Sequence, residues 1–197
     1  MKIGIIDYKY CSLLPIYHSI KSFNVGVDII DKPNQLKNYD KIVLPGVGAT
    51  NRIINYLKEN KFIDEIHNFA ENKKSILGIC AGMQIMAKNL YENQKCQGLG
   101  FFNADVVSIT NGISRISTNI GWVNTKINNK ELAYYYCHSF YMNFEDKKDK
   151  CIKGTISLGS QVPTIIKKKN ILGVQFHPEK IQSNGRNLIS DFIYEKL

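Results

Sequence analysis

Residues Ile76–Gln84 read ILGICAGMQ, in which a short apolar run leads into a cysteine with a glycine two residues away on either side. Such a run predicts a buried strand that turns directly into a helix. In a nucleophile elbow the reactive residue lies on a strained turn, and Gly78 and Gly82 would remove side chains that collide with it. Cys80 is therefore a candidate nucleophile, and a structural cysteine in a glycine-containing turn is the alternative.

The predicted helix start after Cys80 would provide two features that favour nucleophilic catalysis. Unpaired N–H groups and a partial positive charge at a helix N-terminus favour a thiolate over a thiol. The backbone N–H of Ala81 would point to where an oxyanion forms.

Strand-like apolar runs alternate with amphipathic helical segments in the first half of the chain. The strand-like runs are 3–6, 25–30, 41–44 and 75–79, and helical spacing is seen over 13–20, 53–57 and 62–70. This βαβα alternation predicts a largely parallel sheet with helices on both faces. We expect Ser12 to cap the first helix and Pro15 to lie in its first turn.

After about Gly100 the pattern changes to short runs separated by polar turns, which are typical of antiparallel strands. These runs are 104–109, 117–122, 132–137, 151–157, 162–167 and 171–176, and a last helix carries Leu188, Ile189, Phe192 and Ile193. We predict one α/β domain over residues 1–197, with a mostly parallel central sheet flanked by helices and antiparallel strands added in the second half.

Composition excludes several classes of protein. The 197 residues are 44% hydrophobic and 22% charged, and no apolar run approaches the roughly 20 residues of a membrane helix. The N-terminus lacks the pattern of a signal peptide, so we expect a cytoplasmic protein without a membrane partner. The five cysteines lack a CxxC pair and predict neither a disulfide framework nor a metal site.

The net charge of +9 could indicate a nucleic-acid partner. The lysines are scattered, apart from the run 167–169, and this favours a solvated basic surface, with an acidic protein partner as a further option. We expect no nucleic acid to bind.

A second chemistry-bearing stretch is GVQFHPEK at Gly173–Lys180. On a strand, His177 and Glu179 would point to the same side because side chains alternate with a period of two. A histidine with a carboxylate beside it is a base with its orienting partner, as nucleophilic catalysis requires. A surface histidine near a solvated glutamate is the alternative.

Five motifs together resemble the class I, triad-type glutamine amidotransferases. They are LPGVG at Leu44–Gly48, ILGICAGMQ, NIGW at Asn119–Trp122, YYCHSFY at Tyr135–Tyr141 and QFHPEK at Gln175–Lys180. Their order and spacing are similar to those of the glutaminase subunit of imidazole glycerol phosphate synthase. The resemblance implies a flavodoxin-like fold and no cofactor.

By this resemblance, Cys80 attacks the side-chain amide of L-glutamine, His177 protonates the leaving ammonia and then activates water, and Glu179 holds the imidazolium. The oxyanion hole would come from the backbone of Ala81, Gly46 and Val47. In the family the loop that carries Gly46 and Val47 needs rearrangement by the partner, so the isolated subunit is expected to be nearly inactive.

The resemblance also implies residues that bind the substrate. Gln84 matches a glutamine-binding position, Glu92 would pair with the α-ammonium, and the segment His138, Ser139 and Phe140 would contact glutamine largely through its backbone. Without the resemblance, Glu92 would be interpreted as a solvated helix end and His138 as a structural histidine.

The implied partner is a separate TIM-barrel cyclase, which would use the ammonia to form imidazole glycerol phosphate and AICAR in histidine biosynthesis. The counterpart of Trp122 lies near that interface in the family. A core aromatic is the alternative interpretation of Trp122.

The sequence departs from the family pattern at several positions. The glycine-rich turn after the first strand is replaced by DYKYCSL, so Lys9, Tyr10 and Cys11 need a reshaped turn. Asn119 and Ile181 also differ from the usual residues. These changes leave two alternatives open: a paralogue that supplies ammonia for amidating a surface-sugar precursor, and a catalytically silent binding or regulatory module. The intact triad residues argue against the silent module.

Overall fold

The structure is a computed structural model that describes residues 1–110, 117–146, 148–180 and 183–195. Ile181, one of the positions that departs from the family pattern, lies outside these ranges. A parallel sheet forms the centre of the molecule, in the strand order β2-β1-β3-β4-β13. Its strands are β1 (Lys2–Ile6), β2 (Gly26–Ile30), β3 (Lys41–Leu44), β4 (Ser75–Ile79) and β13 (Ile171–Val174).

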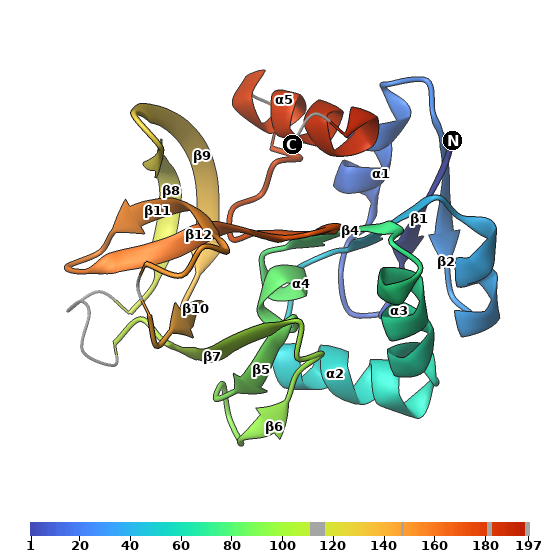
Figure 1. Cartoon of the computed structure of the whole chain (residues 1–197), viewed down its shortest axis with the longest axis horizontal. Helices are drawn as coiled ribbons and strands as arrows, with labels where there is room; N and C mark the ends of the chain where they lie inside the picture. The colour runs from blue at the N-terminus through green and yellow to red at the C-terminus, as the bar shows by residue number, and fades with distance from the viewer. Residues whose placement is uncertain (111–116, 147, 181–182, 196–197) are drawn as a thin grey trace.

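Helices cover both faces of this sheet, as the alternation of patterns predicts. Figure 1 shows α1 (Leu14–Lys21) and α5 (Ser183–Tyr194) on one face, and α2 (Thr50–Glu59) and α3 (Phe62–Glu71) on the other. A short 3-10 helix, Pro33–Asn38, follows β2. Apolar side chains of each helix pair join a separate core cluster on their own face of the sheet. β3, β4 and β13 are almost entirely buried because both of their faces are covered.

The start of α1 differs from the prediction in one respect. Its N-cap is Leu13, and the described residues provide no side-chain hydrogen bond to the cap, so the expectation that Ser12 caps the helix is wrong. Pro15 does lie in the first turn, where its missing N–H leaves no helical hydrogen bond unmade.

Antiparallel strands extend the central sheet to nine strands, as expected for the second half of the chain. Next to β13 lie β12 (Gln161–Lys168), β11 (Ile152–Ser157), β8 (Asn119–Ile127) and β9 (Lys130–His138), each antiparallel to its neighbour. β13, expected among the antiparallel runs, is parallel to β4 on one side and antiparallel to β12 on the other. It joins the two halves of the sheet.

A second sheet of four strands was not expected. It has the order β10-β7-β5-β6, formed by β10 (Phe140–Phe144), β7 (Phe102–Ser108), β5 (Ala87–Leu90) and β6 (Cys96–Gln97). The predicted run 104–109 therefore does not extend the central sheet. Alternate residues of β7, including Phe102 and Val106, instead pack into the same core cluster as α2. This packing places β7 on the side of the central sheet that α2 covers (Figure 1).

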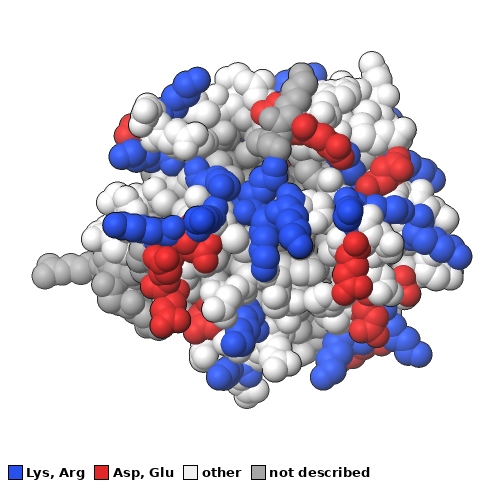
Figure 2. Space-filling view, viewed as in Figure 1, with Lys and Arg blue, Asp and Glu red and all other residues white. Residues whose placement is uncertain are grey.

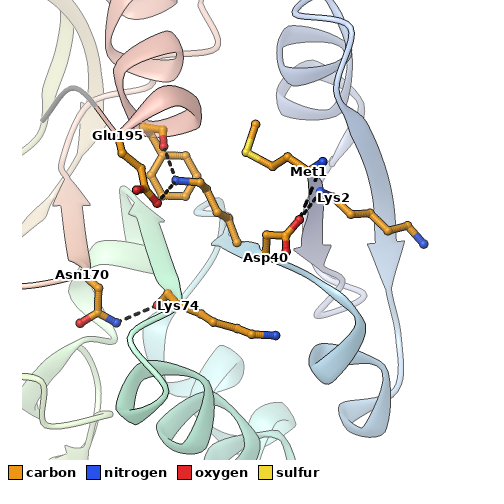
Figure 3. Close-up of polar contacts among 8 residues, drawn as sticks. Met1, Lys2, Asp40, Lys74, Asn170 and Glu195 are labelled. Carbon is orange, nitrogen blue, oxygen red and sulfur yellow. Dashed lines mark hydrogen bonds and ion pairs between the residues drawn. The ribbon is translucent and has the colours of Figure 1, made fainter.

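The amino ends of the parallel strands are closed by polar contacts that Figure 3 shows. Lys41 is only 3% exposed, and its Nζ donates to Glu195 Oε1 at 2.7 Å and to the Phe192 carbonyl at 3.0 Å. Asn170 Nδ2 donates to the Lys74 carbonyl at 2.7 Å. These contacts tie the end of α5 to β3 and the start of β13 to that of β4, leaving the carboxyl ends of the strands as the open edge.

Basic and acidic side chains are mixed on the surface. Figure 2 shows Lys and Arg side chains near the middle of one face, with Asp and Glu side chains on either side of them. A hollow of about 380 Å³ on the molecule is lined by Lys73, Lys167 and Lys169 together with Asp191 and Glu195. Within the described ranges, no helix is long and apolar enough to cross a membrane.

Candidate active site

A cleft of about 540 Å³ opens at the carboxyl ends of β3, β4 and β13. It brings together the predicted triad, oxyanion and substrate-binding residues. These are Gly46, Val47, Cys80, Ala81, Gln84, Glu92, His138, Ser139, Phe140, His177 and Glu179. Ligands of α/β sheets usually bind at this edge, where loops from neighbouring strands meet. Among the described residues, no group of three His, Cys, Asp or Glu side chains could hold a metal ion.

Cys80 occupies the turn between β4 and the short helix α4 (Ala81–Gln84). Its backbone has φ 49° and ψ −110°, a conformation that is strained for a residue with a side chain. Its N–H donates to the Val174 carbonyl at 2.7 Å, which ties the turn to β13. The turn therefore has the strained geometry of a nucleophile elbow, and it holds the sulfur against the end of β13.

The glycines flanking Cys80 serve a different purpose from the predicted one. A Cβ on Gly78 would lie 2.6 Å from the Gly82 carbonyl oxygen, and a Cβ on Gly82 would lie against the Leu44 carbonyl. The collisions that glycine prevents are thus between backbone segments, not with the cysteine. Both glycines allow α4 to pack directly on β4 and on the end of β3.

His177 and Glu179 meet in a turn beyond β13, which ends at Val174. His177 Nδ1 lies 2.8 Å from Glu179 Oε1, and the His177 N–H donates to the Tyr135 carbonyl at 2.8 Å. The Lys180 N–H donates to the His177 carbonyl at 3.2 Å and closes the turn. The argument from strand periodicity was therefore wrong, because the turn at Pro178 brings the two side chains together.

The environment of His177 determines its charge. Burial alone would lower the pKa of His177, but hydrogen bonds with Cys80 and Glu179, together with the negative charge of both groups, raise it to about 10. The imidazole therefore holds its proton at neutral pH. Glu179 Oε2 is buried and has no hydrogen-bond partner in the described part of the chain.

Two further groups contact the Cys80 sulfur. Gln175 Nε2 lies 3.6 Å from Cys80 Sγ, and the Cys137 carbonyl oxygen lies 3.8 Å from it. The sequence reasoning assigned no role to either residue. The available signal for Gln175 was a lone polar residue inside the apolar run 171–176, two positions before His177. No sequence signal pointed to the Cys137 carbonyl, because any residue supplies one.

The predicted oxyanion loop lies beside the nucleophile. A Cβ on Gly46 would be only 2.6 Å from the Ala81 nitrogen, so the loop backbone packs directly on the elbow. Burial raises the pKa of the Cys11 thiol to about 11, and a hydrogen bond from the Val47 backbone opposes this shift. The Val47 backbone therefore lies close to the Cys11 thiol, and Val47 also lines the cleft.

Lys9 forms the turn before Cys11, where the family pattern has a glycine-rich segment. Lys9 has φ 66°, and both its N–H and its Nζ donate to the Asp7 carboxylate at 2.7 Å. The side chain of Tyr10 is exposed and packs edge-on against Tyr56, with 6.0 Å between ring centroids. The bulkier residues are thus placed outside the cleft, while Cys11 faces the oxyanion loop.

Gln84 and Glu92 are held in fixed orientations in the cleft wall. Gln84 Nε2 donates to the Phe140 carbonyl at 2.7 Å and to Gln175 Oε1 at 3.1 Å. Glu92 Oε2 accepts from the N–H and the hydroxyl of Thr50, at 2.6 and 2.7 Å. Glu92 follows β5 and binds the start of α2, where its negative charge is favourable, so its interpretation as a solvated helix end was wrong.

His138 is buried, and both of its ring nitrogens have partners. Nδ1 lies 2.8 Å from the Phe140 carbonyl and Nε2 lies 3.1 Å from Asn119 Nδ2. Burial lowers the pKa of His138 to about 4 despite the hydrogen bond to Phe140, so the ring is neutral. The neighbouring Ser139 hydroxyl pairs with that of Thr118 at 2.9 Å. His138 thus has the properties of the structural histidine that was the alternative interpretation.

Trp122 is 46% exposed, so the alternative of a core aromatic is wrong. It packs edge-on against Tyr135, with 5.6 Å between ring centroids. Two residues earlier on the same strand, Ile120 is 63% exposed and pairs with Cys137. Because Tyr135 and Cys137 line the cleft, the apolar surface of Ile120 and Trp122 adjoins its mouth.

The family model described as glutamine amidotransferase class-I matches residues 5–196 of the chain. The chain belongs to this family. The expectation of an enzyme of this class is therefore confirmed.

Two relatives of the amidotransferase are similar over nearly their whole length. The "Imidazole glycerol phosphate synthase subunit HisH" of Leptospira borgpetersenii is 36% identical, with 96% of this chain and 98% of the relative covered. The protein named "Imidazole glycerol phosphate synthase subunit HisH 1" of Campylobacter jejuni is 33% identical, with the same coverage.

Solved structures confirm the predicted fold class. The structure described as PurLQS from Thermotoga maritima has a TM-score of 0.79 at 17% identity, covering 100% of this chain and 99% of that one. A crystal structure of a glutamine amidotransferase has the same TM-score at 16% identity and covers 98% of both chains. At this identity the likeness concerns the fold alone.

Proposed function

We propose that this amidotransferase is the glutaminase subunit of an imidazole glycerol phosphate synthase. It hydrolyses L-glutamine to glutamate and ammonia, and passes the ammonia to a separate TIM-barrel cyclase subunit in the cytoplasm. The cyclase then forms imidazole glycerol phosphate and AICAR in histidine biosynthesis. The observation that carries this proposal is the near-full-length similarity to relatives of that name, at 36 and 33% identity.

The first half-reaction follows from the placement of Cys80 against His177. The Cys80 thiolate attacks the side-chain carbonyl carbon of glutamine, and the carbonyl electrons move onto oxygen. The protonated His177, which Glu179 orients through Nδ1 at 2.8 Å, then gives its proton to the leaving nitrogen. Ammonia departs and a γ-glutamyl thioester remains on Cys80.

The second half-reaction returns the enzyme to its starting state. His177, now neutral, takes a proton from water as the water oxygen attacks the thioester carbon. The carbon–sulfur bond breaks, the thiolate is regenerated beside protonated His177, and glutamate leaves. In both half-reactions the oxyanion needs the N–H of Ala81 and donors from Gly46 and Val47. The Val47 backbone lies close to the Cys11 thiol, and we propose that the loop rearranges before this hole is complete.

The remaining cleft residues would select the free amino acid. Glu92 carries a negative charge fixed by Thr50, which suits the α-ammonium of glutamine. Gln84 lies one turn after Cys80, and backbone groups of His138, Ser139 and Phe140 would contact the substrate from the opposite wall. A ligand held at its charged end by these groups would present its side-chain amide to the sulfur.

The cyclase would bind on the apolar surface next to the cleft mouth. Ile120 and Trp122 are exposed there, and Val47 and Tyr10 are exposed in the neighbouring loops. Exposed aromatic residues beside polar groups are typical of protein interfaces. Binding at the mouth would close the cleft from water, so that ammonia enters the partner before it becomes ammonium.

Glutamate release tests the chemistry of this proposal. The chain alone should be nearly inactive, and addition of the cyclase subunit from the same organism should activate it. Cys80→Ala should abolish the activity of the complex, whereas Cys151→Ala, a matched change at a half-buried cysteine away from the cleft, should leave it intact. Undiminished turnover in Cys80→Ala would refute the assigned nucleophile.

Complementation tests the pathway. A histidine-requiring strain that lacks its own glutaminase subunit should grow when this chain and its cognate cyclase are supplied. Failure to grow, with an active glutaminase in the cells, would favour the sugar-amidating paralogue. The altered turn at Lys9 and Tyr10 is the sequence feature that keeps this alternative open. A complex that forms without any glutaminase activity would point to the silent module.

A further inference from the structure

Two glutamine side chains and one backbone carbonyl form a hydrogen-bonded chain that ends at the Cys80 sulfur. The Phe140 carbonyl accepts from Gln84 Nε2 at 2.7 Å, and the same nitrogen donates to Gln175 Oε1 at 3.1 Å. At the other end of its amide, Gln175 Nε2 lies 3.6 Å from Cys80 Sγ. These hydrogen bonds link the start of β10 to the nucleophile through the buried Gln175.

The direction of this chain is fixed at its Phe140 end. A backbone carbonyl can only accept hydrogen bonds, so Gln84 must turn its amino group toward Phe140. The other hydrogen of that amino group then meets Gln175, which must present its oxygen there. The amino group of Gln175 is left to face Cys80. The sulfur therefore meets a hydrogen-bond donor that cannot become an acceptor without breaking the rest of the chain.

Burial makes this donor strong and keeps it in place. Gln175 is 0% exposed and Gln84 only 4% exposed, so water does not compete for their amides. The Gln175 backbone N–H also donates to the Thr164 carbonyl at 2.9 Å. A buried amide that lost its partners would carry a desolvation cost, which favours the fully bonded arrangement.

We propose that Gln175 is a positioning residue that holds the Cys80 sulfur as a hydrogen-bond acceptor, and so as the thiolate that attacks glutamine. This inference rests on the proposed role of Cys80 as the nucleophile. The Cys137 carbonyl, 3.8 Å from the sulfur, acts in the opposite direction because it can only accept the thiol proton. The donor on Gln175 opposes the effect of that carbonyl on the sulfur.

Other charged and titratable groups also face the sulfur or line its cleft. His177, which Glu179 orients, follows β13 and hydrogen-bonds to the Cys80 sulfur. The neutral His138 and the Cys137 thiol belong to β9. Glu92 and Lys180 line the cleft walls. Of the groups that contact the sulfur, Gln175 is an uncharged donor that does not titrate, so its effect should persist at every pH at which the protein is folded.

Alkylation of Cys80 by iodoacetamide, followed peptide by peptide with mass spectrometry, measures this effect in the isolated full chain. In Gln175→Leu, alkylation of Cys80 at neutral pH should be about tenfold slower, with the rate–pH profile moved to higher pH, because a hydrogen bond to a charged group is lost. Gln175→Glu should move the profile further, since it places an acceptor against the sulfur. Alkylation of Cys137 in the same cleft should be unaffected, and Gln97→Leu, at an exposed glutamine of β6, should behave like the wild type.

A Cys80 profile that superimposes on the wild type in a folded Gln175→Leu or Gln175→Glu variant would overturn the proposal. If neither variant folds, the side-chain amide resonances of Gln175 can be followed in the wild-type chain by nuclear magnetic resonance. They should shift with pH in parallel with Cys80 reactivity and move when Cys80 is alkylated; resonances that do neither would also overturn it. A wild-type complex with the cyclase that shows no glutaminase activity would refute the proposed function alone and leave the effect of Gln175 on the Cys80 sulfur standing.

Discussion

At the scale of single residues, the cleft is organised by hydrogen bonds that fix which atom can accept and which can donate. His177 holds a proton between two acidic groups, His138 is kept neutral by burial, and the Glu92 carboxyl group is held in place by two hydrogen bonds from Thr50. The two histidines thereby differ in charge at neutral pH, and Glu92 has a fixed orientation. This pre-organisation is what a reaction with alternating proton transfers requires.

The raised pKa of His177 makes the stability of the protein depend on pH. A group whose pKa is higher in the folded state than in the unfolded state stabilises the fold when it is protonated. For His177 this stabilisation is complete below the unfolded-state pKa of 6.5, and it is lost as the pH rises through the folded-state pKa of about 10. We expect the melting temperature to fall between about pH 7 and pH 10, and to fall less in Glu179→Gln, where the imidazolium has lost a partner. Thermal unfolding by circular dichroism measures this, and equal slopes in the two proteins would contradict it.

Cys11 is expected to restrain the oxyanion loop. Its thiol lies close to the Val47 backbone, so Cys11→Ala should loosen the loop and raise glutamine hydrolysis by the isolated chain by about tenfold, a part of the roughly 100-fold or more that one well-placed donor provides. Glutamate release without the cyclase is the measurement, and Cys151→Ala is the control. Unchanged basal activity in Cys11→Ala would show that another contact holds the loop.

Residues whose role lies within one short motif could be predicted from the sequence, while those that act through a distant partner could not. Cys80, His177 and Glu179 each stand in a recognisable stretch, and the structure places all three in the cleft. Gln175 is different because its partner Gln84 is 91 positions away in the chain. The contact of Val47 with Cys11 likewise needs the fold, since the two loops follow different strands.

At the scale of elements, the site depends on how closely β4, α4 and the end of β3 approach one another. Cys80 connects β4 to α4, and the glycines around it let backbone pack on backbone. The strained φ of 49° at Cys80 is maintained by this packing and by its hydrogen bond to β13. Loosening any of the three elements would release the nucleophile from its place.

Gly82→Ala tests this close approach. The added Cβ would lie against the Leu44 carbonyl and 2.8 Å from the Pro45 carbonyl, and these backbone atoms cannot move aside without displacing β3. We expect the free energy of unfolding to fall by at least about 2 kcal/mol, measured by urea denaturation. Gly26→Ala is the matched control, because its Cβ would meet its nearest neighbour at 3.4 Å on an edge strand. Equal effects of the two changes would refute the packing argument.

The helices α2 and α3 could be predicted because their periodicity covers several turns, and β4 could be predicted because it is a continuous apolar run. The short strands β5 and β6 have too few residues for a period to be seen, and β10 follows β9 after a single residue without a turn signal. The second sheet was missed for the same reason. Its existence depends on β5 pairing in parallel with β7, a contact that no local pattern encodes.

At the scale of the whole molecule, the two ends of the parallel sheet have different tasks. The amino ends are closed by contacts such as that of the buried Lys41 with Glu195 (Figure 3), whereas the carboxyl ends carry the cleft. The antiparallel strands β8 and β9 extend the sheet beside the cleft and place Ile120 and Trp122 in solvent next to it. The proposed transfer of ammonia to the cyclase would use an apolar docking surface at this position.

The proposed docking surface predicts a loss of affinity for the cyclase in Trp122→Ala. A large exposed aromatic at the centre of an interface is typically worth about 2 kcal/mol or more, so the dissociation constant should rise on the order of 30-fold. Titration calorimetry with the purified cyclase subunit measures it. Ile29→Ala, at an exposed isoleucine on the opposite edge strand β2, should not change the affinity. An unchanged dissociation constant in Trp122→Ala would place the interface elsewhere.

The central claim is that Cys80 forms a covalent bond to the glutamyl group during hydrolysis. The complex with the cyclase can be quenched with acid during steady turnover of glutamine, digested and analysed by mass spectrometry. The peptide that carries Cys80 should be heavier by one γ-glutamyl group, and this modified peptide should disappear when glutamine is exhausted. Two results would contradict the account in a complex that releases glutamate. The glutamyl group could be found on a residue other than Cys80, or the peptide that carries Cys80 could remain unmodified throughout turnover.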